Sequence, residues 1–477
     1  MSLIRKNFIY NNLFGLTNVL IPIIIFPYVS RILGVSGVGI VSFAISLTAT
    51  FVIIGSLGIP VYGIREIAKV KKDKDQLSAV FSEILVIQFF WLLFTLVLYA
   101  VWLFFTATFI DETIIKYVSF VHIAGLIGML NWFFQGIENY RFITVINAVL
   151  KLVTLVLVFA LVTYPEDYWM YYTILVVSTV LGAVVSVAYS LSFVNLRFKN
   201  LALKRHIKPI SILFGTQLAI GIYINLDIIF LKYFSSDEQV GLYTPASKLV
   251  KLCLLFVTSL GTVLIPKIAM FIKEGKIEES KNIISKSIQF VLLLSLPIMV
   301  VLGMLSSEII ELFAGTAFAF SAVLMRLLVP LIFLIGMSTV FGLQILVPFH
   351  KEKKLLIAVT IGAVISVVLN VVLIPKFASK GAAYAILITE LAITLFTFYY
   401  AKKTISFTYP YKKALHYLLL SVLLIPIALF FKEFFRGITY VLSVSISSFL
   451  FYIFGLILIK DTFFNTYFLQ PILNFRK

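Results

Sequence analysis

Fourteen long apolar runs fill this 477-residue chain almost from end to end, and a few charged residues lie inside them. Each run is about 20 residues long, which is the length a helix needs to cross the hydrocarbon core of a bilayer. A charge in that core is costly unless it faces protein or water, so charges within the runs indicate a polar interior. The sequence therefore predicts an all-α polytopic membrane protein of about 14 transmembrane helices, with a polar path or cavity inside.

The composition leaves no room for a sizeable soluble domain. Apolar residues make up 61% of the chain and charged residues only 13%, whereas about a quarter of the residues of a soluble domain are charged. The single cysteine, Cys253, excludes an internal disulfide. We place the spans at residues 8–31, 38–63, 79–106, 112–134, 142–163, 168–195, 209–233, 240–266, 284–309, 320–347, 355–375, 380–401, 413–431 and 437–460.

The net charge of +18 is spread unevenly over the segments between these spans. With a cytoplasmic N-terminus, 28 of the 39 Lys and Arg residues lie on the cytoplasmic side, seven on the opposite side and four inside spans. Such a bias is the positive-inside pattern of membrane proteins. It predicts a multi-pass membrane protein with both termini in the cytoplasm. The basic charge is then a topology signal, and membrane lipids rather than nucleic acid are the expected surroundings.

A short internal similarity indicates two related halves. Val38–Leu47 resembles Val240–Leu249, with Val, Gly, Ala and Leu at matching places. The two segments open the second and the eighth span, so six spans separate them and both copies have the same orientation in the membrane. We therefore expect two pseudo-symmetric six-helix bundles, residues 1–200 and 201–402, followed by two additional transmembrane helices and a cytoplasmic tail in residues 403–477.

Two lysines lie deep in the eighth span. Lys248 and Lys251 are three residues apart and share one face of a helix. Two cations at this depth repel each other unless an anion or carboxylates lie opposite. They are therefore candidates to bind an anionic ligand such as a phosphate group. The alternative is that they pair with Asp227 and other acidic groups as part of the structure.

Other charges lie at various depths in the remaining spans. Lys151 is midway along the fifth span, and it is a further candidate for the cavity. The alternative is that it pairs with Glu390, which lies at the mirrored depth in the twelfth span. Asp227 in the seventh span and Glu390 in the twelfth are candidates for structural pairing or for coupling to an ion. Arg326 is shallow in the tenth span, where it either reaches outward or contacts a ligand. We expect Glu83, near the cytoplasmic end of the third span, to be a solvated interfacial group.

Two arginines lie at the ends of spans. Arg31 closes the first span on the outer side, and Arg65 closes the second on the inner side. The planar guanidinium group suits phosphate better than a lysine ammonium does. As isolated residues, both also fit the role of anchors at the membrane interface.

No enzyme motif is recognisable in the sequence. The four histidines are scattered, and neither a zinc-protease HExxH motif nor a phosphate-binding Walker A motif is present. We therefore expect a protein that is not an enzyme and that needs no metal and no cofactor. Transport would have to run on an H⁺ or Na⁺ gradient, on the membrane potential or on the gradient of the substrate.

Four segments resemble a known family. They are Phe26–Gly34 (FPYVSRILG), Gly63–Lys69 (GIREIAK), Asn131–Glu138 (NWFFQGIE) and Gln217–Lys251, which contains the run GLYTPASK. Over about the first 250 residues the chain is similar to bacterial polysaccharide repeat-unit flippases of the multidrug/oligosaccharidyl-lipid/polysaccharide exporter superfamily. The remainder matches mainly in the number of spans.

This resemblance implies a protein of the bacterial cytoplasmic (inner) membrane. It also implies a V-shaped pair of six-helix bundles whose central cavity opens alternately to the two membrane faces. The implied substrate is an undecaprenyl-pyrophosphate-linked oligosaccharide, moved to the outer leaflet for O-antigen, capsule or exopolysaccharide assembly, with a polysaccharide polymerase as a partner. Arg31, Lys248 and Lys251 are then candidates to bind the headgroup. Arg65 matches the family as well, but its depth indicates a cytoplasmic gate or surface.

Three alternatives remain. A lipid II flippase and a drug/cation antiporter belong to the same superfamily, although the basic residues of the eighth span argue against an antiporter for cations. A membrane-embedded glycosyltransferase or polymerase would need a sizeable outer loop. The outer connections Thr163–Asp167 and Ser235–Gln239 are only a few residues long.

Overall fold

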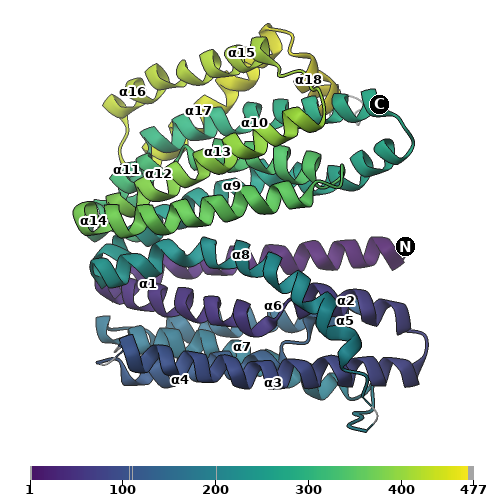
Figure 1. Ribbon diagram of the computed structural model, residues 1–477. Coiled ribbons are helices and arrows are strands. Elements are labelled where there is room, and N and C mark those ends of the chain that lie inside the picture. Colours follow the sequence, from purple (N-terminus) through teal and green to yellow (C-terminus); the bar gives the residue numbers. More distant parts are fainter. Residues whose placement is uncertain (1–2, 107, 110, 200, 471–477) are drawn as a thin grey trace. The chain divides into compact units, whose positions relative to one another are not determined.

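The computed structural model describes residues 3–106, 108–109, 111–199 and 201–470, and every regular element within these ranges is helical (Figure 1). The chain divides into two compact units, residues 1–241 and 242–477, called unit 1 and unit 2 below. Within each unit the long helices run side by side (Figure 1). The all-helical membrane fold predicted from the apolar runs is confirmed.

Unit 1 contains the first eight α-helices, two short 3₁₀ helices and the first turn of the ninth α-helix. Its elements are α1 (Leu3–Ser56), α2 (Ile59–Val70), α3 (Lys74–Thr106), α4 (Thr113–Ala124), η1 (Gly125–Gly128), α5 (Asn131–Gly136), α6 (Tyr140–Leu161), η2 (Pro165–Asp167), α7 (Tyr168–Ser190), α8 (Lys204–Phe234) and the start of α9 (Asp237–Lys273).

Unit 2 holds the rest of α9 and the remaining helices. They are α10 (Ile277–Met304), α11 (Ser306–Ala314), η3 (Thr316–Phe318), α12 (Ser321–Leu328), α13 (Leu331–Thr339), the π-helix η4 (Val340–Leu346), α14 (Glu352–Thr404), α15 (Tyr411–Val422), α16 (Leu424–Phe434), α17 (Gly437–Leu458), α18 (Thr462–Phe464) and η5 (Asn465–Leu469).

The helices account for the predicted spans. In the described residues, 11 helical segments are long and apolar enough to cross a membrane. Two of these segments contain two helices each, since the backbone leaves the helical conformation at Gly34 (φ 66°) in α1 and at Ala378 (φ 48°) in α14. Together with the 31-residue helix α8, each of the 14 predicted spans therefore has a helix.

The second predicted span, 38–63, ends earlier than expected. Leu57 (φ 50°) and Gly58 (φ 73°) both take the left-handed conformation after Ser56, which stops the helix. The chain restarts at Ile59 as the separate helix α2. The charged residues that seemed to close the second span therefore belong to a short amphipathic helix of their own.

The division into units differs from the predicted halves in where α8 belongs. The units separate after Gly241, so α8 packs with the N-terminal helices and has extensive contacts with α1. A repeat is defined by symmetry and not by compactness. The six-helix halves 1–200 and 201–402 therefore stay a prediction.

Aromatic side chains form part of the core of unit 1. Phe81 of α3 is fully buried and lies against two rings of α5, with centroid distances of 5.8 Å to Trp132 and 4.8 Å to Phe133. Helix α2 approaches the same indole so closely that a Cβ atom on Gly63 would lie 2.4 Å from the Trp132 ring. These contacts fix α5 against α2 and α3, and they explain why a glycine and a tryptophan stand in the motif segments.

Two glycines of unit 1, one from the start of each repeated segment, lie against backbone atoms. A Cβ atom on Gly39 of α1 would lie 1.8 Å from the carbonyl oxygen of Asp237, and one on Gly241 of α9 would lie 1.9 Å from the carbonyl oxygen of Val35. Both distances are far below van der Waals contact with backbone atoms, which cannot rotate away. Small residues allow such close helix crossings in membranes. Gly39 and Gly241, which occupy matching places in the two similar segments, thus form a reciprocal backbone contact within unit 1.

We expect Gly39→Ala to lower the free energy of unfolding by about 1–3 kcal/mol, because the two backbones must separate to admit a methyl group. The matched control is Gly15→Ala, since a Cβ atom at Gly15 meets no atom within 4 Å. Thermal unfolding of the purified proteins in detergent measures both. Equal melting temperatures for the two variants would contradict the close crossing.

Candidate functional site

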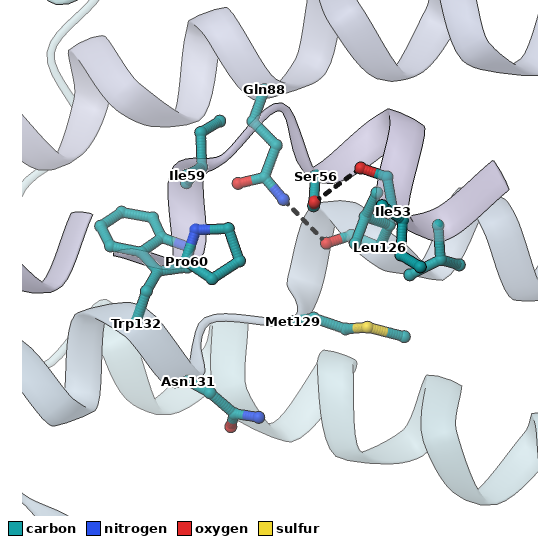
Figure 2. Close-up of a pocket in the computed structure, with 10 residues that line it drawn as sticks. Ile53, Ser56, Ile59, Pro60, Gln88, Leu126, Met129, Asn131 and Trp132 are labelled. Atoms are coloured by element: carbon teal, nitrogen blue, oxygen red, sulfur yellow. Dashed lines mark hydrogen bonds between the residues drawn. The ribbon is translucent and has the colours of Figure 1, made fainter. Parts of the chain in front are cut away.

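The helix predicted at residues 112–134 is interrupted near its C-terminal end. Helix α4 gives way to the 3₁₀ turn η1, and Met129 and Leu130 then leave the helical conformation before α5 begins at Asn131. Within a membrane, an interrupted helix is tolerated where it is buried in protein or lines a cavity. Here Met129 and Asn131 border two cavities of unit 1, one of which is shown in Figure 2.

The more polar of the two, called the Lys151 cavity below, has a volume of about 240 Å³. Helices α1, α5, α6 and α7 all contribute to its wall. Its polar side chains are Asn18, Asn131, Asn147, Lys151, Ser178, Thr179 and Ser186. The cavity therefore offers amide, hydroxyl and ammonium groups within helices that the sequence places in the membrane.

Lys151 is the charged residue of this wall. It lies midway along the 22-residue helix α6 and is half-buried. Among the described residues it forms neither an ion pair nor a hydrogen bond. Since a cation within the membrane is costly without a counter-charge, the cavity is suited to an anion.

Two asparagines beside Lys151 are held in place by hydrogen bonds. Asn147, one helical turn before Lys151, donates from Nδ2 to Thr17 Oγ1 at 2.9 Å, and Asn18 donates from Nδ2 to the carbonyl oxygen of Phe14 at 2.9 Å. The first bond fixes α6 against α1 at the cavity wall, and the second holds the Asn18 side chain against its own helix. The ammonium of Lys151 is left as the strongest donor for a ligand, with the nearby hydroxyls as weaker ones.

The other candidate residues of unit 1 lie outside this wall. The exposed side chain of Arg31 donates from a terminal nitrogen to the carbonyl oxygen of Pro27 at 2.6 Å. Asp227 is buried in α8, with 5% of its surface exposed. Arg65 lies on α2, where its Nε is 3.1 Å from Glu66 Oε1. The structure therefore does not bring these three residues to Lys151.

Glu66 shows that this charged face of α2 is a local ion-pair network. Partial burial alone would raise the pKa of Glu66, but hydrogen bonds from Lys69 and Arg65 outweigh this effect and lower the pKa below its usual value. Arg65 and Lys69 are both more than half exposed. The Arg65 side chain is thus exposed, and its predicted role at a cytoplasmic gate or surface stays a prediction.

Unit 2 holds the remaining candidates. Lys248 and Lys251 are exposed on one face of α9, whereas the preceding residues 240–247 are buried. Glu390 is buried in α14, with 6% of its surface exposed. Arg326 donates from Nε to Ser306 Oγ at 2.6 Å and from a terminal nitrogen to Ser307 Oγ at 2.7 Å. Arg326 therefore ties α12 to α11, whereas the roles of the two lysines and of Glu390 stay predictions.

Glu83 is not the solvated interfacial group that the sequence indicated. Its side chain is only 4% exposed, and Oε2 lies 2.7 Å from Nε2 of the equally buried His206. Arg205 forms an ion pair with the same carboxylate, the backbone N–H of Ala202 donates to Oε1 at 2.7 Å, and Tyr62 Oη is 2.6 Å from His206 Nδ1. The prediction failed because the three residues that contact the Glu83 carboxylate lie more than a hundred residues away in sequence. They are at the start of α8 and in the loop before it.

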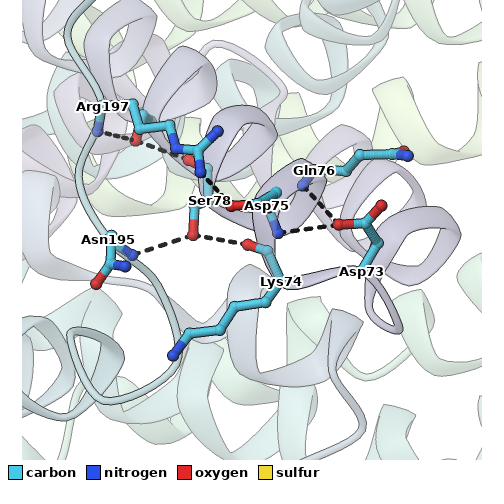
Figure 3. A network of polar contacts seen from close by, with 8 residues as sticks. Asp73, Lys74, Asp75, Gln76, Ser78, Asn195 and Arg197 are labelled. Carbon is cyan, nitrogen blue, oxygen red and sulfur yellow. Dashed lines mark hydrogen bonds and ion pairs between the residues drawn. The ribbon is translucent and has the colours of Figure 1, made fainter.

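The same loop is attached along the start of α3 (Figure 3). The backbone N–H of Asn195 donates to Ser78 Oγ at 3.0 Å, and that of Arg197 donates to Ser82 Oγ at 2.9 Å. The Arg197 guanidinium forms an ion pair with Asp75. The basic connection between the predicted halves is therefore fixed to unit 1 at this end.

Sequence reasoning identified Lys151 but missed the polar residues around it. Asn147 lies four residues before Lys151 and so shares its helix face, which is a signal that the sequence does carry. Asn18 and Ser178 come from other helices, and no spacing along the chain connects them with Lys151.

Comparison with known proteins shows which family the chain belongs to. Residues 4–272, more than half of the chain, match the family model described as "Polysaccharide biosynthesis protein". The chain belongs to this polysaccharide biosynthesis protein family. Residues 213–372 also match the model named MatE.

Relatives of this family member include two proteins with descriptive names. The "Putative O-antigen transporter" of Escherichia coli (strain K12) is 23% identical over 404 residues, which is 82% of this chain and 95% of the relative. The "Probable low-salt glycan biosynthesis flippase Agl15" of Haloferax volcanii is 23% identical over 242 residues, which is 50% of this chain and 51% of that protein.

Solved structures share the fold of this family member. The inward closed conformation of the lipid II flippase MurJ superposes with a TM-score of 0.70 at 16% identity, covering 94% of this chain and 99% of MurJ. An inward-facing multidrug resistance transporter of the MATE family gives a TM-score of 0.66 at 14% identity, covering 81% of this chain and 94% of the transporter. At these identities the likeness shows the fold alone.

Proposed function

We propose that this member of the polysaccharide biosynthesis protein family is a flippase for lipid-linked oligosaccharides. It moves undecaprenyl-pyrophosphate-linked repeat units from the cytoplasmic to the outer leaflet, by alternating access, for O-antigen, capsule or exopolysaccharide assembly. Relatives named as an O-antigen transporter and a glycan biosynthesis flippase support this proposal. The observation that carries it is Lys151, which has no partner among the described residues and lines a polar cavity between helices that the sequence places in the membrane.

The chemistry of the cavity fits the charged part of such a lipid. A pyrophosphate leaves water only where cations and hydrogen-bond donors replace its hydration, and Lys151 with its neighbouring hydroxyls offers both. Lys248, Lys251 and Arg31 are proposed to bind the same headgroup at other stages of its passage. Asp227 and Glu390 are proposed to couple the movement to H⁺ or Na⁺.

The proposal includes the setting of the protein. It is a multi-span membrane protein, and its charge distribution supports a place in the cytoplasmic membrane with both termini inside. It acts as a transporter rather than an enzyme, without a cofactor, and delivers its product to a polysaccharide polymerase.

A lipid II flippase is the second candidate function. The likeness to MurJ supports this alternative at the level of the fold. Both substrates carry a pyrophosphate on a lipid, so the Lys151 cavity serves either. A drug/cation antiporter fits less well, because an unpaired lysine repels a cation.

Depletion of the protein in its own cells separates these candidates. We expect complete undecaprenyl-linked repeat units to accumulate in the cytoplasmic leaflet, with surface polysaccharide lost and peptidoglycan synthesis unchanged. Accumulation of lipid II instead would favour the second candidate. Unchanged glycan lipids with intact surface polysaccharide would contradict the proposal.

A further inference from the structure

The second cavity beside the interrupted helix differs chemically from the Lys151 cavity. It has a volume of about 450 Å³ and is bordered by α1, α2, α3 and the segment around Met129. None of the ten residues that line it is charged. Gln88, Asn131 and Trp132 supply polar groups, and we call it the Gln88 cavity (Figure 2).

Two polar atoms at this wall have no hydrogen-bond partner among the described residues. Gln88 donates from Nε2 to the carbonyl oxygen of Leu126 at 3.0 Å, but its Oε1 accepts no bond. The indole N–H of Trp132 likewise has no acceptor. Both side chains are 2% exposed, so bulk water does not satisfy them. Leaving a buried acceptor and a buried donor unpaired is unfavourable, which points to a ligand that supplies both partners.

The orientation of both groups is fixed by their surroundings. The bond to Leu126 holds the Gln88 amide so that its oxygen is turned away from Leu126, as Figure 2 shows. The Trp132 indole lies between the Phe81 ring and Gly63 of α2, which leaves it no room to rotate. A wall fixed in this way binds a ligand without first having to become ordered.

We propose that the Gln88 cavity binds a sugar unit of the lipid-linked oligosaccharide. A hydroxyl group both donates and accepts, so neighbouring sugar hydroxyls match an unpaired amide oxygen and an unpaired indole N–H. The apolar lining of the cavity suits the C–H faces of a sugar ring. A polyprenyl chain would leave both polar atoms unpaired, and a phosphate would require a cation that this wall lacks.

The position of the cavity supports the same assignment. Met129 and Asn131 border both cavities, so the interrupted helix separates a cationic cavity from a neutral one. In the lipid-linked substrate the pyrophosphate is joined directly to the first sugar. The inference rests on the proposed function. It assigns the pyrophosphate of the lipid-linked substrate to the Lys151 cavity and the first sugar to the Gln88 cavity.

Binding by the purified full-length protein in nanodiscs tests the assignment. The two probes are undecaprenyl pyrophosphate carrying the cell's own glycan and undecaprenyl pyrophosphate without sugar. We expect Trp132→Phe and Gln88→Leu each to weaken binding of the glycan lipid by roughly three- to tenfold, the effect of one lost hydrogen bond. Binding of the sugar-free lipid should not change.

Trp169→Phe, the same substitution on α7 away from both cavities, should bind both probes as the wild type does. Melting temperatures establish that each variant is folded. Unchanged glycan-lipid binding in both variants, meaning a cavity that holds only water, would overturn the sugar assignment alone. Equal losses for the two probes would also overturn it. A wild type that binds neither probe would overturn the proposed function as well.

Discussion

Lys151→Met is expected to slow transport of the lipid-linked oligosaccharide strongly without lowering the melting temperature of the protein. Methionine has a similar length but no charge, so the pyrophosphate loses its principal donor in the Lys151 cavity. Loss of two charge-assisted hydrogen bonds, at about 1.5 kcal/mol each, would slow transport roughly a hundredfold. The fold should not suffer, because Lys151 has no partner among the described residues and a lone charge in the membrane is itself unfavourable.

Two further variants separate binding from structure. Lys151→Arg keeps the positive charge and should retain part of the transport activity. Lys116→Met makes the same substitution near the start of α4, away from both cavities, and should leave transport unchanged. Transport rates and melting temperatures of all three variants are measured together. Full transport by Lys151→Met, or a loss of transport that parallels a loss of folding, would contradict the proposed role.

Glu83→Leu should lower the free energy of unfolding by about 2–4 kcal/mol, because its partners lose a buried acceptor. His206 is only 2% exposed, and its Nε2 lies 2.7 Å from the carboxylate. The backbone N–H of Ala202 would also lose its acceptor. Arg205 is half exposed, so water can replace the carboxylate there. Glu83→Gln preserves the shape and one acceptor, and an intermediate loss is expected.

The control for Glu83 is a carboxylate that pairs at the surface. Glu66→Gln removes ion pairs with Arg65 and Lys69, whose side chains are 55% and 59% exposed. Pairs of this kind contribute about 0–1 kcal/mol. Thermal unfolding in detergent measures both substitutions. If Glu83→Leu unfolds at the same temperature as Glu66→Gln, the buried cluster does not stabilise the attachment of α8 to unit 1.

The positions of the spans could be predicted from the sequence because the length and polarity of an apolar run depend on local composition. The interruptions could not be predicted in the same way. Leu57 and Gly58 stop a helix within a run that reads as one span, and Met129 and Leu130 do so within another. In both places the backbone conformation depends on packing against other helices. The sequence pattern does not show this packing.

The same distinction between local and tertiary properties applies to the residues of the candidate site. The depth of Lys151 follows from its place in α6, so the sequence identified it as a charge within the membrane. Its lack of a partner depends on which side chains face it from α1 and α7, and this is a tertiary property. Glu83 was misjudged for the same reason, since depth alone does not reveal a histidine 123 residues away.

Transbilayer movement by the purified protein is the most direct test of the proposed function. The full-length chain is reconstituted into liposomes that carry undecaprenyl-pyrophosphate-linked glycan, and the rate at which the glycan reaches the opposite leaflet is measured for the wild type and for Lys151→Met. We predict rapid movement with the wild type and a rate close to that of protein-free liposomes with the variant. Equal rates for wild-type and protein-free liposomes would contradict the proposal that this protein is a flippase for lipid-linked oligosaccharides.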